Sequence, residues 1–195
     1  MDDILEIYRE LKSPEAQRWN LTHKNLYVEY NIRKFFSENI NLKTCKSICN
    51  VGIGAGEWDD FLGYMSEGIC RITSIDVDKN ICCKFELRQN FESHPNPSIV
   101  LNDNVLNNNL MWESFDLVTV IGSTIAEIGN YELALSQCLK LLKKNGLIFY
   151  SDFYGFNEPV RFVEFTGNNR IIIHHHAEFR EIESVKFYIF IAQKL

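Results

Sequence analysis

The chain has 195 residues, of which 46% are hydrophobic and 24% charged, and its net charge is −6. This length suits one ordinary domain with its own core, and the composition is typical of neither a disordered nor a membrane protein. The negative charge argues against nucleic acid as the main partner, because phosphate binding needs an excess of Lys and Arg on some face.

The location of the protein can be narrowed from the same data. No apolar run approaches the ~20 residues that span a bilayer. The first residues are acidic and then amphipathic, unlike a secretory signal, so we expect a cytoplasmic protein without a membrane segment.

The six cysteines lie in or beside apolar segments and are expected to be reduced core residues. Cys45 and Cys49 are spaced C-x3-C, but Gly52 stands where an iron–sulfur triplet would continue, and no metal site is expected.

Two helices are expected at the start of the chain. One apolar stripe predicts a helix over residues 2–12, and Ser13-Pro14 then indicates a helix N-cap followed by proline. A second helix is predicted from Thr22 to near Ser37. We expect residues 1–40 to form a helical cap on a core of residues 46–195, the whole being one domain.

From Lys46 onward, strands are predicted to alternate with helices. The predicted strands are SICNVG, ICRITSID, PSIVLND, FDLVTVIG and LIFYSDF, and the main helices between them are EWDDFLGYM, DKNICCKFELRQNF and NYELALSQCLKLLKKNG. The last of these helices is expected to stop at Gly146. Such alternation predicts a parallel sheet with helices on both faces. After a short helix at EPVRFVEF, the segments NNRIIIHHHAEF and SVKFYIFIAQKL predict a terminal antiparallel hairpin.

The segment NVGIGAGEW, residues 50–58, follows the first predicted strand and has glycine at three alternate positions. A loop at this place lies where open α/β sheets bind ligands, and glycine lets the backbone approach a ligand closely. The dinucleotide fingerprint requires glycine where Glu57 stands, and no Lys-Ser/Thr pair of a phosphate loop follows. A nucleoside cofactor with an amino-acid moiety and no phosphate fits best, and a simple tight turn is the alternative reading.

Carboxylates end the next two predicted strands. Asp76 stands where a carboxylate accepts hydrogen bonds from ribose hydroxyls. Asp103 is placed to accept from an adenine amino group, with the backbone N–H of Asn104 meeting a ring nitrogen. Either aspartate alone is more often a turn or helix cap. Together with the glycine loop they predict a nucleoside site.

With these segments the sequence resembles the class I S-adenosylmethionine-dependent methyltransferases. The resemblance covers roughly residues 46–153 through ICNVGIGAG, ITSIDVD, VLNDNVL, FDLVTVIGSTIAEI and LLKKNGLIFYSDF, and FYIFIAQK resembles the reversed last strand of the family. It implies an α/β, Rossmann-like, seven-stranded and mostly parallel sheet in the order 3-2-1-4-5-7-6 with the last strand antiparallel. It also implies cofactor contacts at Asn50, Gly52, Ile53, Gly54, Gly56, Asp76, Val77, Asp103, Asn104 and Ile121.

One position departs from the family pattern, which usually has Asp or Glu where Asn50 stands. Asparagine keeps an acceptor oxygen but loses the charge that would attract the ammonium group of the cofactor. We therefore expect Asn50→Asp to tighten cofactor binding. A degenerate, non-catalytic relative is the alternative, which the intact Asp76 and Asp103 oppose.

The resemblance implies S-adenosylmethionine as cofactor, S-adenosylhomocysteine as product, and methyl transfer by in-line displacement. Such a transfer depends mainly on holding the nucleophile in line and excluding water, so no catalytic triad is needed. The fourth strand lacks the [DN]-P-P-[YF] ending of enzymes that methylate bases, which favours a small-molecule or peptide acceptor. The alternatives are a non-catalytic binding or scaffold protein of the same fold and a nicotinamide-dependent oxidoreductase. The attacked atom and the oligomeric state stay open.

Residues expected near the acceptor come from several segments. The candidate catalytic residues are Tyr27, Tyr30, His174 and Asp152, and the candidate substrate contacts are Tyr30, Arg33, Ser123, Thr124 and Tyr154. For the helix residues, a solvated or packing face is an equally weighted alternative. Strand alternation puts His174 and His176 on one face and His175 on the other, so these histidines are not expected to share one metal ion.

Overall fold

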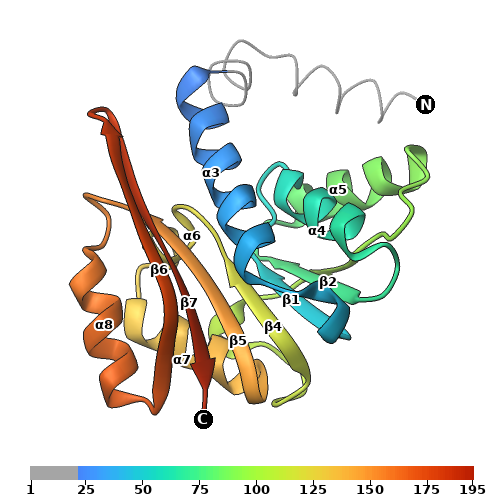
Figure 1. Ribbon diagram of the computed structural model, residues 1–195. Coiled ribbons are helices and arrows are strands. Elements are labelled where there is room, and N and C mark those ends of the chain that lie inside the picture. Colours follow the sequence, from blue (N-terminus) through green and yellow to red (C-terminus); the bar gives the residue numbers. More distant parts are fainter. Residues whose placement is uncertain (1–21) are drawn as a thin grey trace.

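The computed structural model describes residues 22–195 (Figure 1), and the predicted helix over residues 2–12 with Ser13-Pro14 lies outside this range. The first described helix, α3 (His23–Asn39), begins where the sequence predicts, because the Thr22 hydroxyl accepts a hydrogen bond of 3.2 Å from the backbone N–H of Asn25. It extends two residues past the predicted end. The division into a cap and a core within one domain stays a prediction.

Seven strands form one sheet in the order β3-β2-β1-β4-β5-β7-β6. Their bounds are β1 (Ser47–Val51), β2 (Arg71–Asp76), β3 (Ile99–Asn102), β4 (Phe115–Val120), β5 (Leu142–Phe153), β6 (Ile171–Ile182) and β7 (Val185–Lys194). Strands β1 to β5 pair in parallel, and β7 pairs antiparallel with both β5 and β6. The predicted topology, with its reversed last strand, is confirmed.

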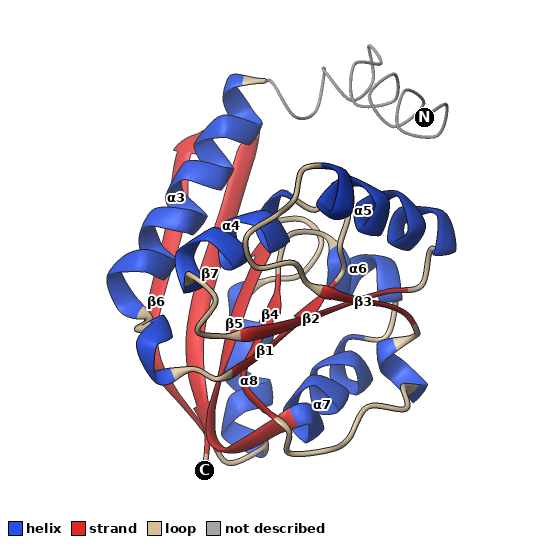
Figure 2. Ribbon diagram, turned by 90° about the vertical axis from the view of Figure 1, so that its right-hand side faces the viewer, coloured by secondary structure: helices blue, strands red, loops and turns tan. Residues whose placement is uncertain are grey.

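Helices cover both faces of the sheet (Figures 1 and 2). The remaining helices are α4 (Glu57–Ser66), α5 (Lys79–Phe91), α6 (Thr124–Ile128), α7 (Tyr131–Leu141) and α8 (Pro159–Asn168), with short 3-10 turns η1 (Leu42–Thr44) and η2 (Val105–Asn107). One apolar layer joins the sheet to α3 and α4 through side chains such as Phe36 and Leu62. The other joins it to α7 and α8 through Leu135 and Phe162. Burial on both faces explains the nearly continuous apolar character of the central strands.

The predicted stop of α7 at Gly146 is wrong. The helix ends at Leu141, and β5 begins at once with an irregular stretch where its pairing to β4 shifts register. Asn145, not Gly146, has the positive φ, at 64°. A Cβ at Gly146 would lie 3.0 Å from the carbonyl oxygen of Lys143 and 3.2 Å from that of Asp116. The glycine therefore permits close packing of two strands rather than ending a helix.

The histidines of β6 do not follow simple alternation. The pairing of β6 with β7 shifts between Ile173 and His175, so one extra residue bulges from the edge strand. His176 stacks on Phe190, whereas Nε2 of His174 lies 3.0 Å from Oε1 of Gln193. Gln193 and Phe190 lie on opposite faces of β7, so the prediction that His174 and His176 share a face is wrong.

The six cysteines are free thiols, and five of them are buried, as expected for core residues; Cys83 is exposed. Burial raises the pKa of the Cys138 thiol to about 12, so it stays protonated.

None of the helices between residues 22 and 195 combines the length and the apolarity that a bilayer crossing requires.

Candidate functional site

A cavity of about 830 Å³ lies at the carboxyl ends of β1, β2, β3 and β4 and is bounded on one side by α3. Its wall is formed by the loop after β1, the ends of the three neighbouring strands and one face of the helix. Cavities of ~300–1,000 Å³ hold cofactors and drug-sized ligands. The cavity is therefore large enough for a nucleoside cofactor, and it lies at the edge of the sheet predicted from the sequence.

The glycine loop forms the floor of this cavity. Gly52, Gly54 and Gly56 all have positive φ, of 86°, 55° and 82°. A Cβ at Gly52 would lie 2.6 Å from the Thr124 hydroxyl, and one at Gly56 would lie 2.4 Å from the Phe85 ring. By contrast, a Cβ at Gly54 would meet no atom within 4 Å. The outer glycines thus allow tight packing of the loop, and the middle one leaves backbone open to a ligand.

Asp76 fixes the loop at the second strand end. One carboxylate oxygen accepts a 2.9 Å hydrogen bond from the backbone N–H of Ile53, and the other accepts a 2.9 Å bond from that of Asp78. Each oxygen of a carboxylate can accept two hydrogen bonds, so both retain capacity for a ligand hydroxyl. Asp76 therefore positions the glycine loop and also presents acceptors to the cavity.

Asp103 and Asn104 line the cavity at the third strand end. The Asp103 carboxylate accepts hydrogen bonds from the backbone N–H groups of Asn104, at 2.8 Å, and Asn109, at 3.1 Å. The side chain of Asn104 caps η2 by accepting from the N–H of Leu106. In this structure the backbone N–H of Asn104 is bonded to Asp103, so it is not free to meet a ring nitrogen as the sequence analysis expected.

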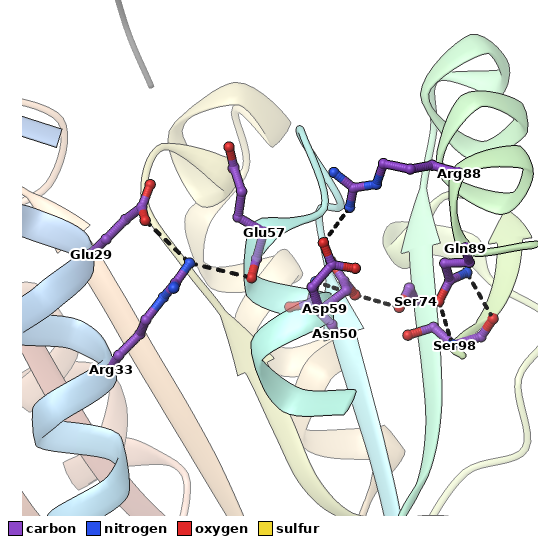
Figure 3. A network of polar contacts seen from close by, with 10 residues as sticks. Glu29, Arg33, Asn50, Glu57, Asp59, Ser74, Arg88, Gln89 and Ser98 are labelled. Carbon is purple, nitrogen blue, oxygen red and sulfur yellow. Dashed lines mark hydrogen bonds and ion pairs between the residues drawn. The ribbon is translucent and has the colours of Figure 1, made fainter. Parts of the chain in front are cut away.

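Asn50 does not line the cavity. Its side chain is fully buried. The amide nitrogen donates 3.0 Å hydrogen bonds to both carboxylate oxygens of Asp59 and to the carbonyl oxygen of Gly52, and the amide oxygen accepts one of 2.8 Å from Thr119 (Figure 3 shows Asn50 and Asp59). The prediction that Asn50 faces the ammonium of the cofactor is wrong, because every polar atom of its side chain is bonded inside the protein.

The partners of Asn50 form a polar cluster beneath the loop, which we call the Asp59 cluster and which comprises Asn50, Asp59, Ser74 and Thr119. Strand register places Ser74 and Thr119 on either side of Asn50, and Asp59 reaches down from α4. Ser74 donates a hydrogen bond to Asp59. Burial raises the pKa of Asp59 to about 7, although the bonds from Ser74 and Asn50 oppose this shift. The carboxylate beneath the glycine loop thus comes from a helix and not from the end of the strand.

The other side of the cavity is formed by α3. Asn25, Glu29 and Arg33 are spaced by four residues, which places them on one face of the helix, and all three line the cavity. An Arg33 guanidinium nitrogen lies 3.1 Å from the Glu29 carboxylate and 3.4 Å from the backbone oxygen of Glu57 (Figure 3). Burial, followed by the charge of Glu29, raises the pKa of Glu57. Asn25 and Glu29 were not among the residues expected from the sequence, although their helical spacing with Arg33 could have indicated them.

The segment after β4 completes the wall with Ile121, Ser123 and Thr124. The Thr124 hydroxyl donates to the carbonyl oxygen of Ile121 at 2.9 Å, and the Ser123 hydroxyl donates to Glu127. Phe153 at the end of β5 also lines the cavity. The two hydroxyls therefore keep acceptor capacity for a ligand, and Phe153 adds an apolar surface beside them.

Comparison with solved structures relates this geometry to known proteins. A methyltransferase dependent on S-adenosylmethionine from Aquifex aeolicus aligns with a TM-score of 0.71 at 15% identity, covering 98% of each chain. A "possible histamine N-methyltransferase" from Thermotoga maritima aligns with a TM-score of 0.68 at 16% identity over 97% of this chain and 99% of its own. The [4+2]-cyclase SpnF aligns with a TM-score of 0.71 at 12% identity, covering 84% and 80%.

The chain has the class I methyltransferase fold. At these identities the likeness concerns the fold alone, and the cyclase shows that proteins of this fold differ in chemistry. Neither models of known protein families nor curated proteins give a match to the sequence. Any assignment of activity must therefore come from the residues of the site.

The methyltransferase fold brings together most of the residues predicted to bind the cofactor and some of those predicted to bind the acceptor. The sequence-predicted residues that line the cavity are Arg33, Gly52, Ile53, Gly54, Asp76, Val77, Asp103, Asn104, Ile121, Ser123 and Thr124. Those that do not are Tyr27, Tyr30, Asn50, Gly56, Asp152, Tyr154 and His174. None of the four candidate catalytic residues is thus part of the cavity wall.

Asp152 and His174 have partners away from the cavity. Asp152 is fully buried and accepts hydrogen bonds from the Tyr150 hydroxyl at 2.7 Å and the Asn157 amide at 2.8 Å. His174 contacts Gln193, which in turn donates to the backbone of Asn145 near the start of β5. The start of a parallel strand is the sheet edge opposite the cavity, so His174 is at the wrong end.

The three tyrosine candidates have other contacts. Tyr27 packs its ring against Phe187 and donates its hydroxyl to Glu181, which joins α3 to the β6–β7 hairpin. Tyr30 is 64% exposed. The Tyr154 hydroxyl accepts hydrogen bonds from Arg180.

Within residues 22–195, no group of three His, Cys, Asp or Glu side chains is arranged to hold a metal ion.

Proposed function

We propose that the protein binds S-adenosylmethionine in the cavity and transfers its methyl group to a small-molecule or peptide acceptor. The observation that carries this proposal is the convergence of Gly54, Asp76 and Asp103 from three neighbouring strand ends on one cavity. The open space at Gly54 fits a ligand that lies against backbone. When bound, the cofactor would supply a methyl group activated by the sulfonium.

The residues of the wall have distinct roles in this proposal. Asp76 would accept hydrogen bonds from the ribose hydroxyls with its remaining lone pairs. Val77, Ile81 and Leu106 would provide apolar surface for the base. The open backbone at Gly54 would leave room for the amino-acid part of the cofactor.

The acceptor would lie between α3 and the segment after β4. Val28 and Ile32 line this end of the cavity and would exclude water, which methyl transfer by in-line displacement requires. A solved neighbour of the same fold is described as a possible N-methyltransferase of histamine, which is consistent with an acceptor of this size. We propose a cytoplasmic location for this reaction.

Calorimetric titration with S-adenosylmethionine and S-adenosylhomocysteine tests the proposal. We expect both to bind in the micromolar range and Asp76→Ala to weaken both by about tenfold or more, because charge-assisted bonds to ribose are lost. Asp76→Asn, which keeps the side-chain size, separates the loss of charge from collapse of the loop. Glu164→Ala removes the same charge from the exposed face of α8 and should leave both affinities unchanged.

The outcomes separate the competing functions. If neither ligand binds, the proposal is rejected. Binding without methyl transfer to any molecule of a metabolite extract would favour the non-catalytic binding protein. Quenching or absorbance changes with a nicotinamide cofactor, in place of adenosyl binding, would favour the oxidoreductase.

A further inference from the structure

Negatively charged side chains greatly outnumber positively charged ones in the cavity wall. Six carboxylates line it, from Glu29, Glu57, Asp76, Asp78, Asp103 and Glu127. Among the described lining residues the guanidinium of Arg33 is the only cation. Asp76, Asp78 and Asp103 belong to the end assigned to the nucleoside and are bonded to backbone N–H groups or cap a helix. The acceptor end therefore holds three glutamates against one arginine.

The arginine does not neutralise all three glutamates. Arg33 pairs with Glu29, and the nearby Arg88 pairs with Asp60 at 2.5 Å. Over the described part of the chain, no ion pair reaches the carboxylates of Glu57 or Glu127. Glu57 is half-buried at the first turn of α4, and Glu127 is an exposed residue at the rim (Figure 3 shows Glu57). Two carboxylates at the acceptor end thus lie outside the ion pairs of the described residues, although the charges of Arg88 and Arg33 act on Glu57.

Apolar side chains line the same end of the cavity. Val28 and Ile32 of α3 and Phe153 of β5 line the same end, and Phe153 lies beside the loop after β4, with a ring atom 3.6 Å from where a Cβ of Gly122 would stand. Burial and the charge of Glu29 raise the pKa of Glu57, and the charges of Arg88 and Arg33 offset this shift only in part. A ligand cation would offset it further, and an aromatic ring such as Phe153 attracts cations as well.

We propose that the methyl acceptor is a small organic cation, an amine with an apolar body, whose ammonium group binds between Glu57 and Glu127. This inference rests on the proposed function, whose acceptor it specifies. A neutral acceptor of the same shape would bring no positive charge to Glu57, and an anion would be repelled by both carboxylates.

The same arrangement suits the chemistry of an amine. An ammonium group has no free lone pair, so one proton must leave before the nitrogen can act as a nucleophile. Glu57 can accept this proton at a carboxylate oxygen: one N–H bond breaks, one O–H bond forms, and the nitrogen keeps the electron pair. A carboxylate whose pKa is raised by burial is a better proton acceptor than an exposed one.

The test uses three probes that differ only in their head group: 2-phenylethylamine, 2-phenylethanol and phenylacetate. Each is titrated into the protein saturated with S-adenosylhomocysteine, which fills the nucleoside end and carries no sulfonium charge. We expect the amine to bind about tenfold or more tightly than the alcohol, and phenylacetate to bind weakest. Glu57→Gln should weaken the binding of the amine by about tenfold and change the affinity for the alcohol by less than about twofold.

Controls separate the binding role from a structural one. Glu164→Gln makes the same charge change on α8 and should alter none of the affinities. Glu127→Gln should cost the amine less than Glu57→Gln, because Glu127 is exposed to water at the rim. An unchanged affinity of Glu57→Gln for S-adenosylhomocysteine shows that the glycine loop is intact.

The results overturn the inference if the amine has no preference over the other two probes, or if Glu57→Gln weakens all three alike. Failure of S-adenosylhomocysteine to bind would instead reject the proposed function. The amine series without cofactor would then still decide whether the cavity prefers a cation. Binding of S-adenosylhomocysteine with equal affinity for the three probes would leave the methyltransferase proposal standing and remove only the cationic acceptor.

Discussion

Asp59 and Asp152 are both almost completely buried, but only Asp59 is linked to the loop that lines the cavity. Asp59 lies beneath the glycine loop, where Asn50 and Ser74 donate to it. Asp152 lies near the end of β5 and accepts from Tyr150, Asn157 and the backbone of Phe153. Both carboxyls have a raised pKa because they are buried.

Their connections differ. The Asp59 cluster reaches the loop itself, because the same Asn50 amide that donates to Asp59 also donates to the carbonyl oxygen of Gly52. The Asp152 bonds join β5 to the segment before α8, and none of them involves a residue that lines the cavity except Phe153. A buried acid with a shifted pKa is therefore not by itself a sign of a site; its link to the ligand-facing backbone decides its importance.

Asn50→Asp gives the largest expected effect in this comparison. The variant would bring a second carboxylate to about the 3.0 Å at which the Asn50 amide now meets Asp59, and would remove the donor to Gly52. We expect a loss of about 3–5 kcal/mol in the free energy of unfolding at pH 7, measured in urea. This reverses the expectation from the sequence that the new acid would tighten cofactor binding.

The double variant Asn50→Asp/Asp59→Asn serves as the control for this effect. It returns an amide to a position facing the carboxylate, so it should recover more than half of the lost stability, while Gly52 still lacks its donor. If the double variant is no more stable than Asn50→Asp alone, repulsion between the two carboxylates is not the cause.

The substitutions Asp59→Asn and Asp152→Asn sharpen the comparison between the two clusters. Each leaves donors without an ionised acceptor, so each should cost about 1–3 kcal/mol of stability. Only Asp59→Asn should also weaken the binding of S-adenosylmethionine, by about threefold or more. The reason is that it frees the Asn50 amide that holds the glycine loop. Calorimetry at a temperature where both variants are folded measures this. An equal effect of both variants on affinity would contradict the proposed link to the loop.

The pH dependence of stability provides a smaller effect. Asp59 has a pKa of about 7 when folded, against an ordinary value of 3.8, so between these values the folded state binds more protons than the unfolded state. Stability from this group is therefore highest at low pH and falls by up to ~1.4 kcal/mol per pH unit as the pH rises to about 7. Asp59→Asn should flatten this part of the curve of unfolding free energy against pH. A curve parallel to that of the wild type would show that Asp59 titrates normally.

His174→Ala gives the smallest expected effect. The residue is exposed, and its partner Gln193 is at the sheet edge opposite the cavity. We expect a change of less than ~0.5 kcal/mol in stability and none in affinity for S-adenosylmethionine. A loss of cofactor affinity in this variant would mean that the cavity is not the binding site.

The sequence by itself predicted the sheet and the edge of the sheet at which the cavity lies. Alternation of apolar strands with helices predicted the parallel core, and the reversed last strand followed from the resemblance to the methyltransferase family. Glycines at alternate positions and acids at the strand ends, such as Asp76, are local signals, since each depends on its own strand and turn. In a parallel sheet the carboxyl ends of neighbouring strands lie at one edge, so a correctly predicted topology brings these residues together.

Tertiary structure alone decided which side chains face the cavity. The direction of Asn50 depends on Asp59, Ser74 and Thr119, which come from three other elements, and no local pattern reveals such a combination. The bulge in β6 likewise changed the faces of its histidines, because one extra residue shifts every later side chain. The charges of the acceptor end arise where α3 meets the first turn of α4. Contacts between elements distant in sequence are set by packing, and for that reason the sequence could locate the cavity but not its full lining.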